Sequence, residues 1–107
     1  MKGFDASLGN MMKQAQDLQK RMAQVQEDLR TRVVEGTAGG GMVTAQVSGK
    51  MDLVALKINA EVVNPDDVEM LQDLIIAAVA QATQKARDLA QKEMSKVTGG
   101  MPMPGMF

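Results

Sequence analysis

The chain has 107 residues, enough for one domain, and contains neither Cys nor His. It therefore lacks disulfides, thiolate ligands, and the commonest general base and metal ligand, so we expect no enzyme active site, no cofactor and no metal. Its net charge of −1, taken alone, argues against a nucleic-acid partner. We find no signal peptide and no apolar run of roughly 20 residues, which predicts a cytoplasmic protein outside the membrane.

The charge is unevenly distributed along the chain. Between Ile58 and Gln84 there is no Lys or Arg, but this stretch holds the acidic residues Glu61, Asp66, Asp67, Glu69 and Asp73. The remaining chain carries all 12 basic residues and only 8 acidic ones. With two Phe as the only aromatic residues, the core must be built from aliphatic side chains and Met, and we expect self-association to complete it.

An amphipathic helix is predicted from about Asp5 or Asn10 to about Arg30. Its apolar residues recur in alternating steps of three and four, the spacing of a heptad stripe. These residues are Leu8, Met11, Ala15, Leu18, Met22, Val25 and Leu29. We favour a stripe that packs on another helix of the same chain; the alternative is a coiled coil with a second chain.

The apolar period then changes to two, which predicts an antiparallel meander of three strands. The strands are expected at Arg32–Thr37, Met42–Ser48 and Leu53–Ala60. A Gly cluster at 39–41 lacks the Lys-Ser/Thr of a phosphate loop and lies between strands, so it favours a tight hairpin. The apolar face needs a cover from the flanking helices or from a partner sheet. Its residues are Val43, Ala45, Val47, Val54, Leu56 and Ile58.

A second long helix is predicted from Asp66 to about Val97. Asn64 suits the N-cap, Pro65 the first helical position, and the following acidic residues favour the positive end of the helix dipole. Gly99 and Gly100 end this helix. The fold class is therefore α+β, with a single domain over residues 1–98 and a flexible Gly/Pro/Met tail over residues 99–107.

Basic residues lie along both predicted helices. An ordinary solvated surface with local ion pairs explains them, but so does contact with a DNA phosphate backbone without base reading. In the second interpretation, the candidate DNA-binding residues are Lys13, Lys20, Arg21, Arg30 and Arg32 on the first helix, and Lys85, Arg87, Lys92 and Lys96 on the second.

Several stretches are distinctive in their order and spacing: residues 36–43 (GTAGGGMV), 47–49 (VSG), 71–79 (LQDLIIAAV), Glu93-Met94 and 98–100 (TGG), with Lys20-Arg21-Met22 in a Met- and Gln-rich opening. Through these stretches the sequence resembles the YbaB/EbfC family of bacterial nucleoid-associated proteins over nearly its whole length. Two positions depart from the family pattern: Ala80-Gln81 stands where Asn-Asp is common, and Gln72 where Glu is usual.

The resemblance implies a homodimer whose sheets associate and whose long helices project like the arms of tweezers. The six apolar sheet residues named above then become the expected dimer interface. It also implies binding of double-stranded DNA with little sequence preference, a place in the nucleoid, and roles in DNA organisation and gene regulation.

A protein-interaction adaptor for DNA replication or repair factors is the alternative function. The heptad stripe and the Met-rich tail would then be its contact surfaces, and the acidic stretch from Glu61 to Asp73 favours it.

Overall fold

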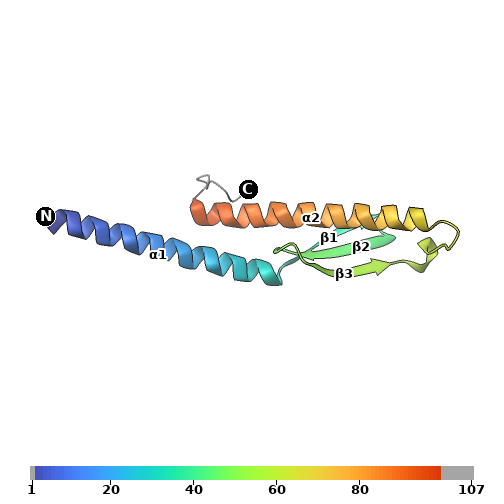
Figure 1. Cartoon of the computed structure of the whole chain (residues 1–107), viewed down its shortest axis with the longest axis horizontal. Coiled ribbons are helices and arrows are strands. Elements are labelled where there is room, and N and C mark those ends of the chain that lie inside the picture. The colour runs from blue at the N-terminus through green and yellow to red at the C-terminus, as the bar shows by residue number, and fades with distance from the viewer. Residues whose placement is uncertain (1, 100–107) are drawn as a thin grey trace.

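The computed structural model describes residues 2–99, with side chains from residue 7 onward. The predicted order of helix, three-stranded antiparallel sheet and helix is confirmed (Figure 1). Its elements are α1 (Lys2–Thr31), β1 (Val33–Ala38), β2 (Val43–Ser48), β3 (Leu53–Ile58), a short 3₁₀ helix (Ala60–Val62) and α2 (Val68–Thr98).

The molecule is long and thin, with extents of 78 × 21 × 16 Å. Its radius of gyration is 20.7 Å, whereas a compact chain of this length has about 13 Å. Much of this elongation comes from α1, whose 30 residues span about 45 Å and run well beyond the end of α2 (Figure 1). Roughly the first two thirds of α1, up to about Met22, is therefore a projecting arm.

The root of α1 is anchored on the turn between β2 and β3. Leu29 is buried, and a Cβ on Gly49 would lie 2.6 Å from its carbonyl oxygen. The Gly49 N–H donates a hydrogen bond to the Arg32 carbonyl oxygen at 2.9 Å. These contacts fix the point from which the arm leaves the body of the protein.

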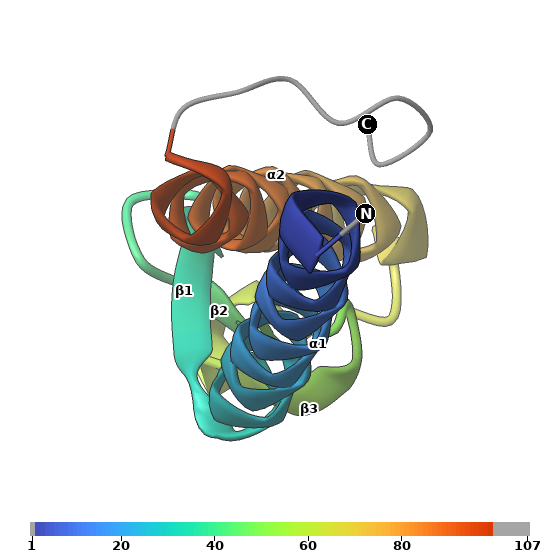
Figure 2. The same cartoon turned by 90° about the vertical axis from the view of Figure 1, so that its left-hand side faces the viewer.

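The core lies between α2 and the first two strands. Val43, Ala45 and Val47 of β2 are fully or almost fully buried, and the α2 residues that pack with them are Ala78, Ala82 and Ala86. Because these helix residues are small and Gly36 of β1 has no side chain, the helix backbone approaches the sheet closely. Figure 2 shows α2 lying across this side of the sheet, with α1 running out toward the viewer.

The strands follow the order β1-β2-β3, with one irregularity that the alternating pattern did not predict. Val43 pairs with Ile58 and Ala45 with Leu56, as a regular register requires. The register then shifts between Gln46 and Val47, so that Leu53 pairs with Val47. Leu53, and not Val54, therefore continues the apolar face of β3.

The first hairpin has the backbone that its turn residues predict, whereas the second does not. Gly39, Gly40 and Gly41 have φ angles of 64°, 67° and 94°, which confirms a tight turn between β1 and β2. In the next turn Met51 takes a positive φ of 72°, where a side chain is less favourable.

The start of α2 differs from the prediction. Asp67, not Asn64, is the N-cap: its carboxylate accepts a hydrogen bond from the Met70 N–H at 3.1 Å. The Asn64 side chain instead accepts from the Asp66 N–H at 3.0 Å, in a turn that holds Pro65 before the helix begins. The predicted C-terminal end is confirmed, since Gly99 adopts the left-handed conformation with a φ of 67°.

Replacing Asp67 by alanine should lower the free energy of unfolding by about 1 kcal/mol, because one N–H of the first helical turn loses its partner. Asn64→Ala removes a hydrogen bond of the preceding turn and should cost less. Urea unfolding of the two variants at equal protein concentration measures the difference. A larger loss for Asn64→Ala would place the cap at the residue that the sequence pattern favoured.

Candidate nucleic-acid interface

The apolar stripe of α1 is covered only near its root. Leu29 is buried and Val25, Met22 and Leu18 are half-buried, whereas Met11 is 63% exposed. Packing on another helix of the same chain thus explains the last part of the stripe. The projecting part is left uncovered in a single chain.

Three candidate DNA-binding residues lie on this arm. Lys13 and Lys20 are seven residues apart and so project from nearly the same side of α1, while Arg21 lies about 100° further round. All three are exposed, and none forms an ion pair with another residue that the structure describes. Their positive charges are therefore available to an external anion.

The candidates at the root of the arm have acidic partners within the chain. Arg30 forms an ion pair with Glu27, one turn earlier on α1. Arg32 was grouped with the basic residues of the first helix, although the first strand was also predicted to begin there; it follows the end of α1 and joins it to β1. From this position it reaches across to Glu93 of α2.

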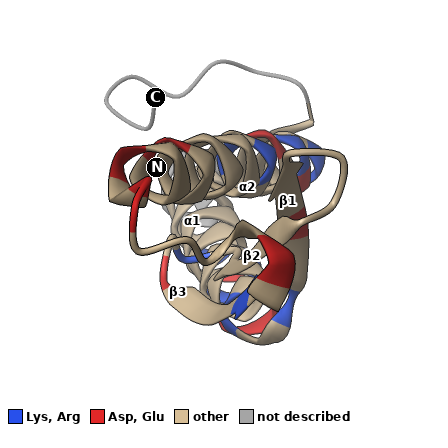
Figure 3. Cartoon of the chain, turned by 90° about the vertical axis from the view of Figure 1, so that its right-hand side faces the viewer, with Lys and Arg blue, Asp and Glu red and all other residues tan. Residues whose placement is uncertain are grey.

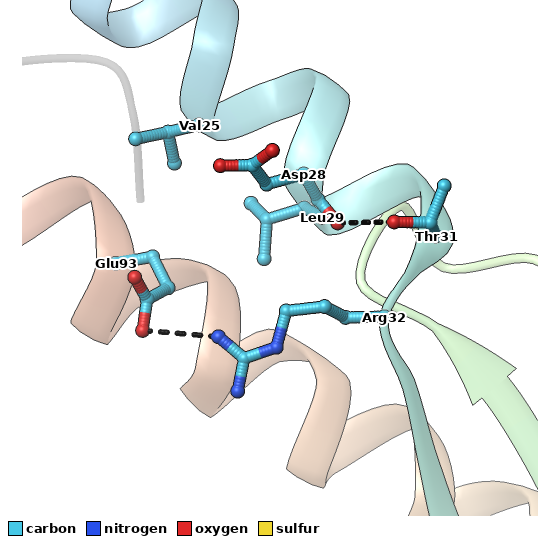
Figure 4. Close-up of a pocket in the computed structure, with 6 residues that line it drawn as sticks. All are labelled: Val25, Asp28, Leu29, Thr31, Arg32 and Glu93. Carbon is cyan, nitrogen blue, oxygen red and sulfur yellow. Dashed lines mark hydrogen bonds and ion pairs between the residues drawn. The ribbon is translucent and has the colours of Figure 1, made fainter.

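This contact, which we call the clasp, connects the junction of α1 and β1 to α2 beside a cavity of about 300 Å³ (Figure 4). One Glu93 carboxylate oxygen accepts from Arg32 Nη1 at 3.3 Å and from Lys96 Nζ at 3.2 Å. The hydrogen bond from Lys96 and the charge of Arg32 lower the pKa of the Glu93 carboxyl, although desolvation opposes them. The clasp therefore stabilises the fold above the ordinary pKa of Glu and is lost as pH falls through the lowered pKa.

The candidates on α2 do not form one surface. Lys85, Lys92 and Lys96 share a side of the helix through spacings of seven and four residues. Arg87 is two residues from Lys85 and so projects about 200° away round the helix, where it donates a hydrogen bond to Gln84 at 3.1 Å. The arm and one side of α2 thus hold most of the predicted basic set.

Acidic residues gather at the opposite end of the molecule. Figure 3 looks onto the end where α2 begins and shows red segments at the start of that helix and in the chain leading to it. They include Asp66, Asp67 and Glu69, whereas Lys13 and Lys20 lie on the distant arm. The segregation of charge in the sequence is therefore a segregation along the long axis.

The six apolar residues of the sheet fall into two groups. Val43, Ala45 and Val47 lie under α2 and have no accessible surface to offer a second copy. The β3 group, Val54, Leu56 and Ile58, remains 53%, 38% and 38% exposed. Leu53, which was not among the six, is 52% exposed and takes the place of Val54 on this face. Any interface on this face is thus formed by β3 and not by β2.

Comparison with known proteins identifies the family. The profile of the YbaB/EbfC DNA-binding family matches residues 4–101. The chain belongs to this family. It is 52% identical to a nucleoid-associated protein of Alkaliphilus metalliredigens and 55% identical to one of Clostridium perfringens, with 98% of this chain covered in both cases and 92% and 96% of the relatives.

The fold is also shared with a solved structure of lower similarity. The crystal structure of the uncharacterized protein HP0035 from Helicobacter pylori superposes with a TM-score of 0.72 at 21% identity. The match covers 88% of this chain and 96% of that one. The predicted fold class is thereby confirmed.

Membership of the YbaB/EbfC family makes the chain a DNA-binding protein and not an enzyme. Among residues 2–99 no group of three acidic side chains gathers as a metal site. In the same range neither long helix is apolar enough to cross a membrane.

Gln81, one of the departures from the family pattern, has a structural role. Its side-chain oxygen accepts a hydrogen bond from the Thr37 N–H at 2.7 Å. Because β1 is an edge strand, this contact satisfies a backbone donor that has no neighbouring strand on that side. The side-chain amide of Gln81 thus connects α2 to the edge of the sheet.

Two features of the site were missed by the sequence analysis. The partnership of Glu93 with Lys96 has a local signal in their three-residue spacing, but nothing in the sequence pairs Glu93 with Arg32, 61 positions away. Leu53 was missed because the register shift in β2–β3 leaves no trace in an alternating pattern.

Proposed function

We propose that the protein binds double-stranded DNA as a homodimer, mainly through phosphate contacts and with little sequence preference, and that it organises or bends DNA in the nucleoid and so influences gene expression. The observation that carries this proposal is the projecting arm with its exposed Lys13, Lys20 and Arg21. The nucleoid-associated relatives support the place of action.

The chemistry of the arm favours the backbone over the bases. Lys and Arg on an exposed helix attract phosphates from any sequence, and the release of counterions makes such binding strong at low salt. Five of the 13 acidic residues, Glu61, Asp66, Asp67, Glu69 and Asp73, lie toward the far end of the molecule. The repulsion that DNA meets at the arm is therefore weaker than the net charge of −1 suggests, although Asp17 lies on the arm between Lys13 and Lys20.

The exposed face of β3 supports the homodimer. In the sheet, Ile58 pairs with Val43 and Leu56 with Ala45, so all four side chains lie on one face. The two β2 residues are 0% exposed because α2 covers them, while their β3 partners stay open. A second copy placed over β3 would complete this half-covered face and set two arms at a fixed spacing.

The direct test is a gel shift with two unrelated duplexes of equal length, repeated at rising salt. We expect both duplexes to bind at low salt and both affinities to fall steeply as salt rises. Failure to bind at low salt would refute DNA binding by this chain alone, and binding to only one duplex would refute the lack of sequence preference.

Replacing Leu56 by aspartate should convert the dimer into a monomer, since a buried unpaired carboxylate in an interface costs several kcal/mol. Lys57→Asp, on the opposite face of the same strand, is the matched control and should remain dimeric. Light scattering at micromolar concentration, with circular dichroism to check folding, measures both. A wild-type chain that is monomeric, or a Leu56→Asp variant that is still dimeric, would contradict this interface.

The adaptor function has one observation in its favour. The acidic end also carries exposed apolar residues, Val63, Val68 and Ile76, which suit a basic, amphipathic segment of a replication or repair protein. Charge reversal of the basic residues on both helices discriminates the two functions. If the reversed protein loses its cellular function but keeps its DNA affinity, the adaptor explains it.

A further inference from the structure

A shallow apolar groove runs along the projecting part of α1. It has a volume of about 450 Å³ and is lined by Met12, Ala15, Gln16, Leu18, Gln19 and Met22. It lies on the side of the helix away from Lys13 and Lys20, which project roughly 100° or more from its centre. The groove is therefore separate from the proposed phosphate-binding surface.

The end of α2 lies where this groove begins. The two helices run in opposite directions, and Glu93 of α2 lines the same cavity as Val25 of α1 (Figure 4). From Glu93 to the end of α2 at Thr98, the helix advances about 7.5 Å toward the tip of the arm. This distance brings the chain to the level of Met22, the root end of the groove.

The eight residues that follow Gly99 match the groove in length. Eight residues, 100–107, would span about 25 Å if they were extended as in polyproline. From Met22 to Met12 the arm rises about 15 Å. The segment is therefore long enough to reach the groove and follow it to its far end.

The chemistry of the segment also matches. It reads Gly-Met-Pro-Met-Pro-Gly-Met-Phe and carries no charged side chain. Met side chains adapt to irregular apolar surfaces, and the two Pro residues have no N–H that burial would leave without a partner. The side chains of Gln16 and Gln19 on the wall of the groove offer amide donors to the remaining backbone carbonyls.

We propose that the segment Met101–Phe107 docks in the groove of α1 of its own chain and braces the arm. The docked segment covers Ala15 of the apolar stripe and the exposed sides of Leu18 and Met22. It also joins the arm to the end of α2, so that the arm is held at its middle as well as at its root.

The absence of Cys from the chain allows a disulfide test. The full-length variant Gln19→Cys/Met103→Cys places one thiol on the groove and one in the segment. The matched control, Gln24→Cys/Met103→Cys, moves the first thiol about 140° round the same helix, to an exposed position nearer the end of α2. If the rate of disulfide formation depended only on proximity to the start of the segment, the control pair would react faster. A faster reaction of the Gln19 pair therefore requires docking in the groove.

Under a mild oxidant at low protein concentration, the Gln19 pair should form a disulfide at least ten times faster than the Gln24 pair. Mixing isotope-labelled and unlabelled chains, followed by mass spectrometry, should show both sulfurs in one chain. Adding Ala15→Asp, which places a charge in the groove, should lower the rate to that of the control.

Equal rates for the two pairs would overturn the proposal. So would a product that joins two chains, which would mean that the segment docks on a neighbouring copy. A covalent dimer from the single variant Gln19→Cys, at a rate that matches the double variant, would show that a second arm fills the groove instead. None of these outcomes depends on DNA binding, so the test stands apart from the proposed function.

Discussion

Replacing Gly36 by alanine should lower the free energy of unfolding by about 3 kcal/mol, at the upper end of the cost of overpacking. A Cβ at this position would lie 2.3 Å from the Ala78 carbonyl oxygen and 2.3 Å from the Ala82 nitrogen, both backbone atoms of α2. Backbone cannot rotate away as a side chain can, so the helix must move off the sheet. Such a movement would loosen the packing along the whole core.

Gly9→Ala is the matched control for this substitution. Gly9 lies within α1, and a Cβ there has no atom within 4 Å. Alanine should therefore stabilise the helix by about 0.5–1 kcal/mol, the difference in helix propensity. Denaturant unfolding at a fixed protein concentration compares the two, since a dimer's stability depends on concentration. A Gly36→Ala variant as stable as the wild type would contradict the close approach of α2 to β1.

The elements of the fold could be predicted because each is set by local chemistry. The step pattern from Leu8 to Leu29 fixes α1, and glycines able to take positive φ fix the turn at 39–41. The cap of α2 was misplaced because Asn64 and Asp67 are both good N-caps. The Asn64 side chain bonds within the turn before the helix, which leaves Asp67 as the residue that caps α2. The sequence pattern does not show which of these two arrangements forms.

The candidate site could be predicted less well because it depends on the approach of residues that are distant in the sequence. Basic side chains at helical spacing indicate a surface, and Lys13 and Lys20 do lie on an exposed arm. Whether a charge is free depends on neighbours such as Glu93, which the chain brings to Arg32 only after folding. In the same way, alternation predicts an apolar face but not that α2 covers β2 and leaves β3 open.

Neutralising two charges on the arm should weaken DNA binding by about 10³-fold at 0.1 M salt in a dimer with both arms engaged. The variant is Lys13→Gln/Lys20→Gln, which removes two positive charges from each arm and four from the dimer. Each phosphate that is no longer neutralised should also reduce the slope of log affinity against log salt by about 0.9. Fluorescence anisotropy of a labelled duplex at several salt concentrations measures affinity and slope together.

The matched control removes the same charge elsewhere. Lys50→Gln/Lys57→Gln neutralises two exposed lysines outside the predicted DNA-binding set, one in the turn between β2 and β3 and one on β3, and should leave the slope close to that of the wild type. The two variants have the same net charge, so a general electrostatic effect would weaken both equally. Only binding of phosphates by the arm separates them. Equal slopes in the two variants would move the phosphate-binding surface away from α1, while an unchanged slope in both would leave Lys85, Lys92 and Lys96 as the basic set to test next.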